Sequence, residues 1–210
     1  DLIVKTKKTI DKYLLHPDNY TLTIARLEPE NNLELMCDGY LLSDNQLPYY
    51  IIGNHNTKYG AFLKEKYKNT NIHFLGAIFN KEELDTFRYY ASYYLHGHSV
   101  GGTNPARIEA MAAQAFVIVH DNPFNKSVVS ENTFSFNSKE KLTFYESLWL
   151  KNEQRYKIKY KINIISNSEY KEQKGTSQKK VFVYHNFELG DMFQMNGEIR
   201  YLTTIYDEVL

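Results

Sequence analysis

The sequence has little of what would mark several common classes of protein. It contains one cysteine, Cys37, which excludes an intramolecular disulfide and favours a reducing compartment. Its 25 basic and 25 acidic residues balance, so no overall field favours nucleic acid or a membrane surface. No apolar run approaches the roughly 20 residues that span a bilayer. These absences together favour a globular protein of the cytoplasm.

Several signatures of catalysis and phosphate binding are missing as well. Gly97, Gly102 and Thr103 come close to a P-loop, but the lysine that must follow the second glycine is absent. The G-x-G-x-x-G of dinucleotide-binding enzymes does not occur, and neither does H-E-x-x-H or C-x-x-C. His96 and His98 could in principle hold a metal, but no Cys or carboxylate cluster lies near them in sequence. We therefore predict packed or loop-bonding histidines, no metal and no cofactor.

Apolar strands and short helices alternate along the first two thirds of the chain. The predicted strands span 20–26, 48–54, 71–79, 92–98, 116–121 and 133–137, and the predicted helices 31–42, 58–68, 80–91 and 104–114. This alternation predicts βαβ units and an α/β, Rossmann-like, doubly wound parallel sheet. In the first helix we expect Leu33, Met36 and Leu41 to point inward, with Cys37 in the core. The helix at 80–91 should begin with a cap at Asn80, since Glu83 follows three residues later, close to a capping box.

The two ends of the chain differ from this core. Residues 1–19 are expected to be a linker from a missing N-terminal domain, since the sequence starts at Asp1 without a signal peptide. Residues 138–210 are expected to be a Lys-rich extension and a C-terminal helix. Residues 138–180 lose the alternation and gain lysine, with an edge strand predicted at 157–165, and the helix is predicted at 196–210. Such a basic face is usually solvated, and peripheral contact with anionic lipid is the weaker alternative.

The helix predicted at 104–114 starts in an unusual way. First turns commonly carry Asp or Glu, which offset the positive end of the helix dipole, and this one has none. Gly101 and Gly102 precede it and permit a tight turn. Free N–H groups at 103–107, together with the dipole, would form an anion site of phosphate size. An ordinary strand–helix turn is the alternative, and the missing carboxylates favour the anion site.

Two charged residues are expected at the same edge of the sheet. Arg26 ends the first strand, where a guanidinium can fork onto a diphosphate; the alternative is a surface pair with Glu28 or Glu30. Glu109 lies on an Ala-rich, partly buried helix face, where a carboxylate needs partners. Ribose hydroxyls are natural donors to it, and backbone or solvent is the alternative. Together the two residues would hold a phosphate at one end and a ribose at the other.

Three segments carry a resemblance to a known family: "IARLEPENN", "NIHFLGAIFNKEELDTFRYYASYYLHGHSVGGTNPARIEAM" and "VIVHDNPFNKSVV". In order and spacing they resemble the C-terminal, donor-binding domain of GT-B glycosyltransferases of the large family 4 class (group 1). They look closest to the rhamnosyltransferases of bacterial capsule and cell-wall polysaccharide synthesis. The resemblance covers about residues 20–137, which would form the nucleotide-sugar-binding core. It implies that the chain is one half of a GT-B fold, with the active site between two Rossmann-like domains.

The resemblance also implies roles for particular residues. Of two glutamates that the class carries eight positions apart, the second matches Glu109, expected on the nucleotide ribose, and the first falls on Gly101. Asn31 stands where the class has a lysine, so one positive charge is missing. The residues expected on the donor diphosphate are Arg26, Asn31, Gly101, Gly102, Thr103 and Asn104. The residues expected beside the nucleobase are Ala77, Ile78 and Phe79.

The function implied is that of a glycosyltransferase, of which this chain is a part. The donor would be a dTDP- or UDP-linked sugar, and the saccharide or lipid-linked acceptor would be bound by the missing domain. The location implied is the cytoplasm, at the inner face of the bacterial membrane. Catalytic residues are not identified, and the loss of the carboxylate at Gly101 leaves open whether the anomeric configuration is retained. A non-catalytic nucleotide-binding or regulatory module and an α/β oxidoreductase without the usual fingerprint remain as rival hypotheses.

Overall fold

The structure of the chain is a computed structural model. It describes residues 5–43, 45–100, 104–129, 134–151, 160–165, 181–184, 192–195 and 202–207, with side chains described as far as 145, apart from those of 127–129. In this part of the chain, no helix is both long and apolar enough to cross a membrane.

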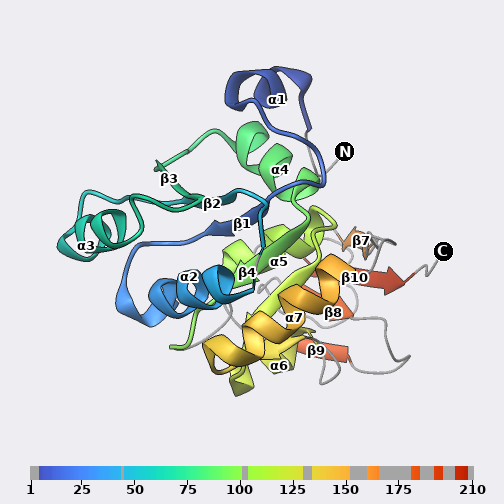
Figure 1. Ribbon diagram of the computed structural model, residues 1–210. Coiled ribbons are helices and arrows are strands. Elements are labelled where there is room, and N and C mark those ends of the chain that lie inside the picture. The colour runs from blue at the N-terminus through green and yellow to red at the C-terminus, as the bar shows by residue number, and fades with distance from the viewer. Residues whose placement is uncertain are drawn as a thin grey trace.

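Six parallel strands form the central sheet (Figure 1). In spatial order they are β3 (Ile72–Gly76), β2 (Tyr49–Ile52), β1 (Thr21–Ile24), β4 (Tyr93–His96), β5 (Val117–His120) and β6 (Ser135–Phe136). Each strand pairs in parallel with its neighbours. The predicted doubly wound, Rossmann-like sheet is confirmed. The strand order reverses between β1 and β4, and at such a switch point a crevice opens beyond the carboxyl ends of the strands.

Helices cover both faces of this sheet. Residues of α1 (Lys7–Tyr13), α4 (Lys81–Tyr90) and α5 (Pro105–Ala112) pack in one hydrophobic cluster. Residues of α2 (Leu33–Leu42), α3 (Lys58–Lys66) and α7 (Lys139–Lys151) pack in a second cluster. Tyr94 belongs to the first cluster, whereas Tyr93 and Leu95 belong to the second. Successive residues of a strand point to opposite faces, so one buried strand supplies both cores. The short helices η1 (Pro29–Asn31) and α6 (Pro123–Val129) follow β1 and β5.

Two local predictions for the helices have different outcomes. The Asn80 side chain accepts a hydrogen bond of 3.0 Å from the Glu83 amide, so the predicted cap of α4 is confirmed. In α2, Leu33 and Met36 are buried as predicted, but Leu41 is 42% exposed. At about 100° per residue, Leu41 lies roughly 140° around the helix from Met36, which takes it off the buried face.

The C-terminal part departs from the prediction for residues 196–210. The structure has a strand there, β10 (Leu202–Asp207), which pairs antiparallel with β7 (Tyr160–Ile165). Its β-branched and aromatic residues suit a strand, and the apolar spacing that suggested a helix did not decide the outcome. The edge strand predicted at 157–165 is confirmed as β7 over 160–165, while β8 (Val181–Tyr184) and β9 (Met192–Met195) pair antiparallel with each other. Helix α7 packs on α2, where Thr143 donates to the Gly39 carbonyl over 2.9 Å.

Candidate functional site

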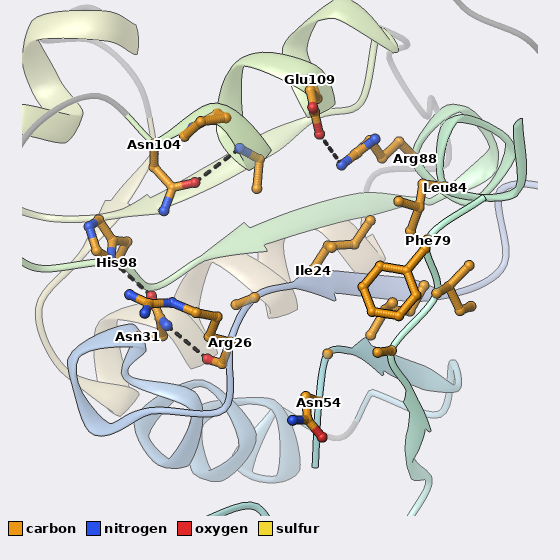
Figure 2. Close-up of a pocket in the computed structure, with 17 residues that line it drawn as sticks. Ile24, Arg26, Asn31, Asn54, Phe79, Leu84, Arg88, His98, Asn104 and Glu109 are labelled. Carbon is orange, nitrogen blue, oxygen red and sulfur yellow. Dashed lines mark hydrogen bonds and ion pairs between the residues drawn. The ribbon is translucent and has the colours of Figure 1, made fainter. Parts of the chain in front are cut away.

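A pocket of about 640 Å³ opens beyond the carboxyl ends of β1, β2 and β3 and beside the start of α5. Figure 2 shows the side chains that line it. Seven of the residues expected at the site line this pocket: Arg26, Asn31, Ala77, Ile78, Phe79, Asn104 and Glu109. Gly101, Gly102 and Thr103 lie outside the described residues. The fold therefore brings together segments that are up to about eighty positions apart in the chain, as parallel strands sharing one edge should.

Arg26 follows β1 at the pocket's polar end. Its side chain is 77% exposed, and its Nη2 lies 3.7 Å from Glu30 Oε1. That separation is long for an ion pair, and exposed pairs of this kind contribute little to stability. The guanidinium is therefore available to a ligand, while the alternative pairing with Glu30 is present in a loose form.

Asn31 has a different environment from the one expected for a diphosphate ligand. Its side chain is buried; Nδ2 donates to the Arg26 carbonyl over 2.7 Å, and Oδ1 lies 2.9 Å from Nδ1 of His98. Both ends of the amide are thus engaged by the protein. In this structure Asn31 joins the segment after β1 to the segment after β4, and Figure 2 shows both bonds.

Helix α5 begins with Asn104 as its cap, followed by Pro105, and its first turn contains no acidic residue. The Asn104 side chain accepts from the Ala106 amide over 3.0 Å, and its carbonyl accepts from the Arg107 amide over 3.2 Å. Pro105 has no N–H. The expectation of free N–H groups at these positions is therefore wrong for Ala106 and Arg107, because the Asn cap uses them. The uncompensated positive end of the dipole remains.

Glu109 carries the carboxylate of the pocket and is held by a residue that sequence reasoning missed. Arg88 of α4 donates from Nη2 to Oε2 of Glu109, and also lies 3.4 Å from Oδ1 of Asp85 through Nη1. The side chains of Arg88 and Asp85 are 3% and 2% exposed, whereas that of Glu109 is 55% exposed. Lys81 completes the row by pairing with Asp85. Charges of alternating sign thus run from the surface to a carboxylate that faces the pocket.

The other end of the pocket is apolar. Ile24, Ile52, Ile78 and Leu84 line it, and Phe79 stands at its rim with 91% of its surface exposed. In Figure 2, Phe79 and Leu84 lie beside Arg88, and His98, Asn31 and Asn104 lie at the opposite end. The pocket therefore has a polar end and an aromatic end with a carboxylate between them.

Behind the polar end lies a buried group of basic side chains. Burial, with Arg107, His98 and His120 nearby, holds the pKa of His96 well below its usual value, so this ring is neutral. Burial also lowers the pKa of the Arg107 guanidinium to about 10, and its Nη1 donates to Oδ1 of Asn125. The expectation of packed and loop-bonding histidines is confirmed, since His96 is buried and His98 bonds to Asn31.

No local signal could have identified Arg88. It lies 21 positions before its partner Glu109, on a different helix, and its spacing from Asp85 is that of any helical ion pair. Within the described side chains, no group of three or more His, Cys, Asp or Glu residues is placed to hold a metal ion.

A comparison with protein families decides what kind of domain this is. The sequence profile described as "Glycosyl transferases group 1" matches residues 5–169, well over half of the chain. The chain belongs to the glycosyl transferases group 1 family. This confirms the resemblance at the level of the family and assigns the α/β domain to a class of glycosyltransferases. No curated protein sequence matches the chain.

Solved glycosyltransferase structures share the fold of this group 1 domain at low sequence identity. The C-terminal domain of a group 1 glycosyl transferase (LpcC) from Francisella tularensis is 16% identical, with a TM-score of 0.60 over 74% of this chain and 89% of that domain. Anabaena Alr3699/HepE in complex with UDP and glucose is 15% identical, with a TM-score of 0.60 over 72% of this chain. The group 1 domain covers 45% of the length of that protein. The catalytic domain of cholesterol-α-glucosyltransferase from Helicobacter pylori is 19% identical, with a TM-score of 0.52 over 64% of this chain and 88% of that one.

Proposed function

We propose that this chain is the donor-binding domain of a glycosyltransferase that takes a sugar from a nucleoside diphosphate. The observation that carries the proposal is the pocket at the switch point of the sheet, where Arg26 and the start of α5 lie at one end, Phe79 at the other and Glu109 between them. A ligand with a diphosphate, a vicinal diol and a planar base, in that order, matches this sequence of groups.

Each part of such a donor has a partner of suitable chemistry. The diphosphate would lie between the Arg26 guanidinium and the positive end of α5, which has no acidic residue in its first turn. The ribose hydroxyls would donate to the exposed carboxylate of Glu109. The base would lie along 77–79 against the exposed ring of Phe79, since aromatic faces attract planar bases.

The finer identity of the substrates rests on two kinds of support. Fold relatives that were solved with UDP or UDP-glucose favour a uridine nucleotide. The resemblance of the "HGHSVGGTNP" segment to rhamnosyltransferases of capsule and cell-wall polysaccharide synthesis favours a dTDP-linked rhamnose. We propose a saccharide or lipid-linked acceptor bound by a second domain, with the reaction at the inner face of the bacterial membrane.

The proposal is tested by titrating the chain with UDP, dTDP and NAD⁺ in a calorimeter. We expect UDP or dTDP to bind at one site and NAD⁺ not to bind. Binding of NAD⁺ without either nucleoside diphosphate would return the chain to the oxidoreductase hypothesis. If the nucleotides bind but the longer protein transfers no sugar, the non-catalytic module becomes the better description.

Replacing Arg26 with alanine should weaken diphosphate binding selectively. Its guanidinium meets the diphosphate charge and nothing on the nucleoside, so UDP affinity should fall by about 1 kcal/mol, near fivefold, with uridine affinity unchanged. Lys58→Ala, which removes an exposed cation from the start of α3, is the matched control and should leave both affinities unchanged. Equal losses for UDP and uridine would argue that Arg26 shapes the pocket and does not contact phosphate.

A further inference from the structure

His98 lines the pocket at its polar end, and its hydrogen bond identifies which ring nitrogen carries a proton. Asn31 Nδ2 donates to the Arg26 carbonyl over 2.7 Å. A flipped amide would place its oxygen against that carbonyl oxygen, so the orientation is settled by the bond. Asn31 Oδ1 therefore faces His98 Nδ1 at 2.9 Å, and Nδ1 must be the donor. In the neutral ring the lone pair then lies on Nε2.

Neighbouring segments hold the His98 backbone in place. Its carbonyl accepts hydrogen bonds from Asn122 Nδ2 over 3.0 Å and from Asn125 Nδ2 over 2.9 Å. On the residue before it, a Cβ at Gly97 would lie 2.2 Å from the Asn31 carbonyl oxygen, so this close approach needs a glycine. The ring is therefore held before any ligand arrives, and such preorganisation lowers the cost of binding.

Of the three histidines in this region, His98 is the one that lines the pocket, and the charged groups around it are neutral, buried or paired. His96 on β4 and His120 on β5 have pKa values that burial lowers, so both rings are neutral. Arg107 on α5 is fully buried and bonds to Asn125. In the segment after β5, the Asp121 carboxylate is paired, with Lys126 at 2.7 Å and Lys141 at 3.8 Å.

The pocket itself offers little positive charge to a diphosphate. Of the described residues that line it, Arg26 and Arg88 are the ones with guanidinium groups. Arg88 is buried between Asp85 and Glu109, which compensate its charge. Arg26 is exposed but has Glu30 within 3.7 Å. A diphosphate at this end would thus meet one shared guanidinium, the dipole of α5 and the His98 ring. Within the described residues, His98 Nε2 has no hydrogen-bond partner.

We propose that His98 is a second cationic group for the donor diphosphate: on binding, Nε2 takes up a proton from solvent and donates it as a hydrogen bond to a phosphate oxygen. Nδ1–H stays on Asn31 throughout, so Asn31 acts as a positioning residue for His98 and does not contact the diphosphate. The proposal rests on the proposed function. The proposal also explains why the buried side-chain amide of Asn31 lines a phosphate site. Asn31 orients His98, which becomes the cation, and supplies no charge of its own.

The test uses the full chain, with UDP and uridine as probes, or dTDP and thymidine if the chain prefers them. His98→Gln keeps a polar contact to Asn31 but cannot become charged, so UDP affinity should fall about tenfold while uridine affinity is unchanged. Asn31→Ala should also weaken UDP binding, and in the double variant it should add nothing to the loss from His98→Gln. UDP binding to His98→Gln as tight as to the unmodified chain would overturn the proposal.

A second measurement on the unmodified chain keeps the test independent of how the variants fold. In ¹⁵N-histidine spectra, His98 should show Nδ1–H and an unprotonated Nε2 without ligand, and both nitrogens protonated when UDP is bound. Calorimetry in buffers of different ionisation enthalpy should then report the uptake of a proton. A Nε2 that stays unprotonated in the UDP complex would overturn the assignment of His98 alone. Absence of any nucleotide binding would overturn the proposed function, and this proposal with it.

Discussion

Replacing Arg88 with methionine is expected to lower the free energy of unfolding by about 3–5 kcal/mol, because one partner of a buried charge pair is removed. Asp85 is 2% exposed and would be left with Lys81 as its counter-ion, and Glu109 would lose its anchor. Methionine keeps much of the side-chain volume, so the loss reports charge and hydrogen bonding more than packing. Urea denaturation followed by circular dichroism measures the change.

Two further variants show whether the charge row is responsible. Asp85→Asn combined with Arg88→Met removes the stranded carboxylate and should recover part of the stability. Lys12→Met removes a cation whose partner Glu83 lies 2.7 Å away on the surface, with 51% of the lysine side chain exposed, and should have a much smaller effect. If Arg88→Met and Lys12→Met destabilise the chain equally, the Arg88 pair is as well solvated as the surface pair, and our account of a buried row is wrong.

Replacing Glu109 with alanine is expected to weaken UDP binding by about 1–3 kcal/mol, the scale of hydrogen bonds to a charged group. The reason is that the ribose hydroxyls would lose their acceptor, the Glu109 carboxylate, which Arg88 holds and which is 55% exposed. Arg88 holds the carboxylate by Oε2, which leaves Oε1 and the remaining lone pairs for the ligand. The fold should be retained, since Asp85 still accompanies the guanidinium. Calorimetry with UDP gives the affinity, and circular dichroism gives the fold.

A modified ligand serves as the control for this prediction. 2′,3′-Dideoxyuridine diphosphate lacks both hydroxyls, so its affinity should be the same for the Glu109→Ala variant and the unmodified chain. A similar loss for both ligands would mean that Glu109 acts by its charge on the whole pocket. Unchanged affinity for UDP would leave Glu109 as a partner of Arg88 with no role in binding.

Local sequence was sufficient for the sheet and for several helix ends. Strand β1 follows from a run of apolar and β-branched residues. The cap of α4 follows from Asn80, whose side chain accepts a hydrogen bond from the amide three positions later. The same kind of reasoning failed for residues 202–207, because their apolar spacing suits a helix while their composition suits a strand. Pairing with β7, about forty residues earlier, decided for the strand.

The positions of Arg26, 77–79, Asn104 and Glu109 around one pocket could be predicted, because parallel strands must deliver their carboxyl ends to one edge. What each side chain does there could not. Asn31 was predicted at the diphosphate and does line the pocket, but its bond to His98, 67 positions away, could not be predicted. The amides at the start of α5 were expected to be free, but the Asn104 side chain accepts a hydrogen bond from the Ala106 amide.

By itself, the sequence determined the alternation of strands and helices, the absence of acid in the first turn of α5 and the membership of the family. The alternation and the first turn of α5 depend on residues within a few positions of one another, where periodicity and capping operate, and the family is identified from the order of such segments along residues 5–169. Tertiary structure decided which charges compensate one another. Arg88 meets Glu109 because α4 and α5 lie on the same face of the sheet, and Asn31 meets His98 because β1 and β4 are neighbours at the switch point. Hydrogen bonds reach about 3 Å, so contacts between distant positions exist only once the strand order has placed their elements side by side.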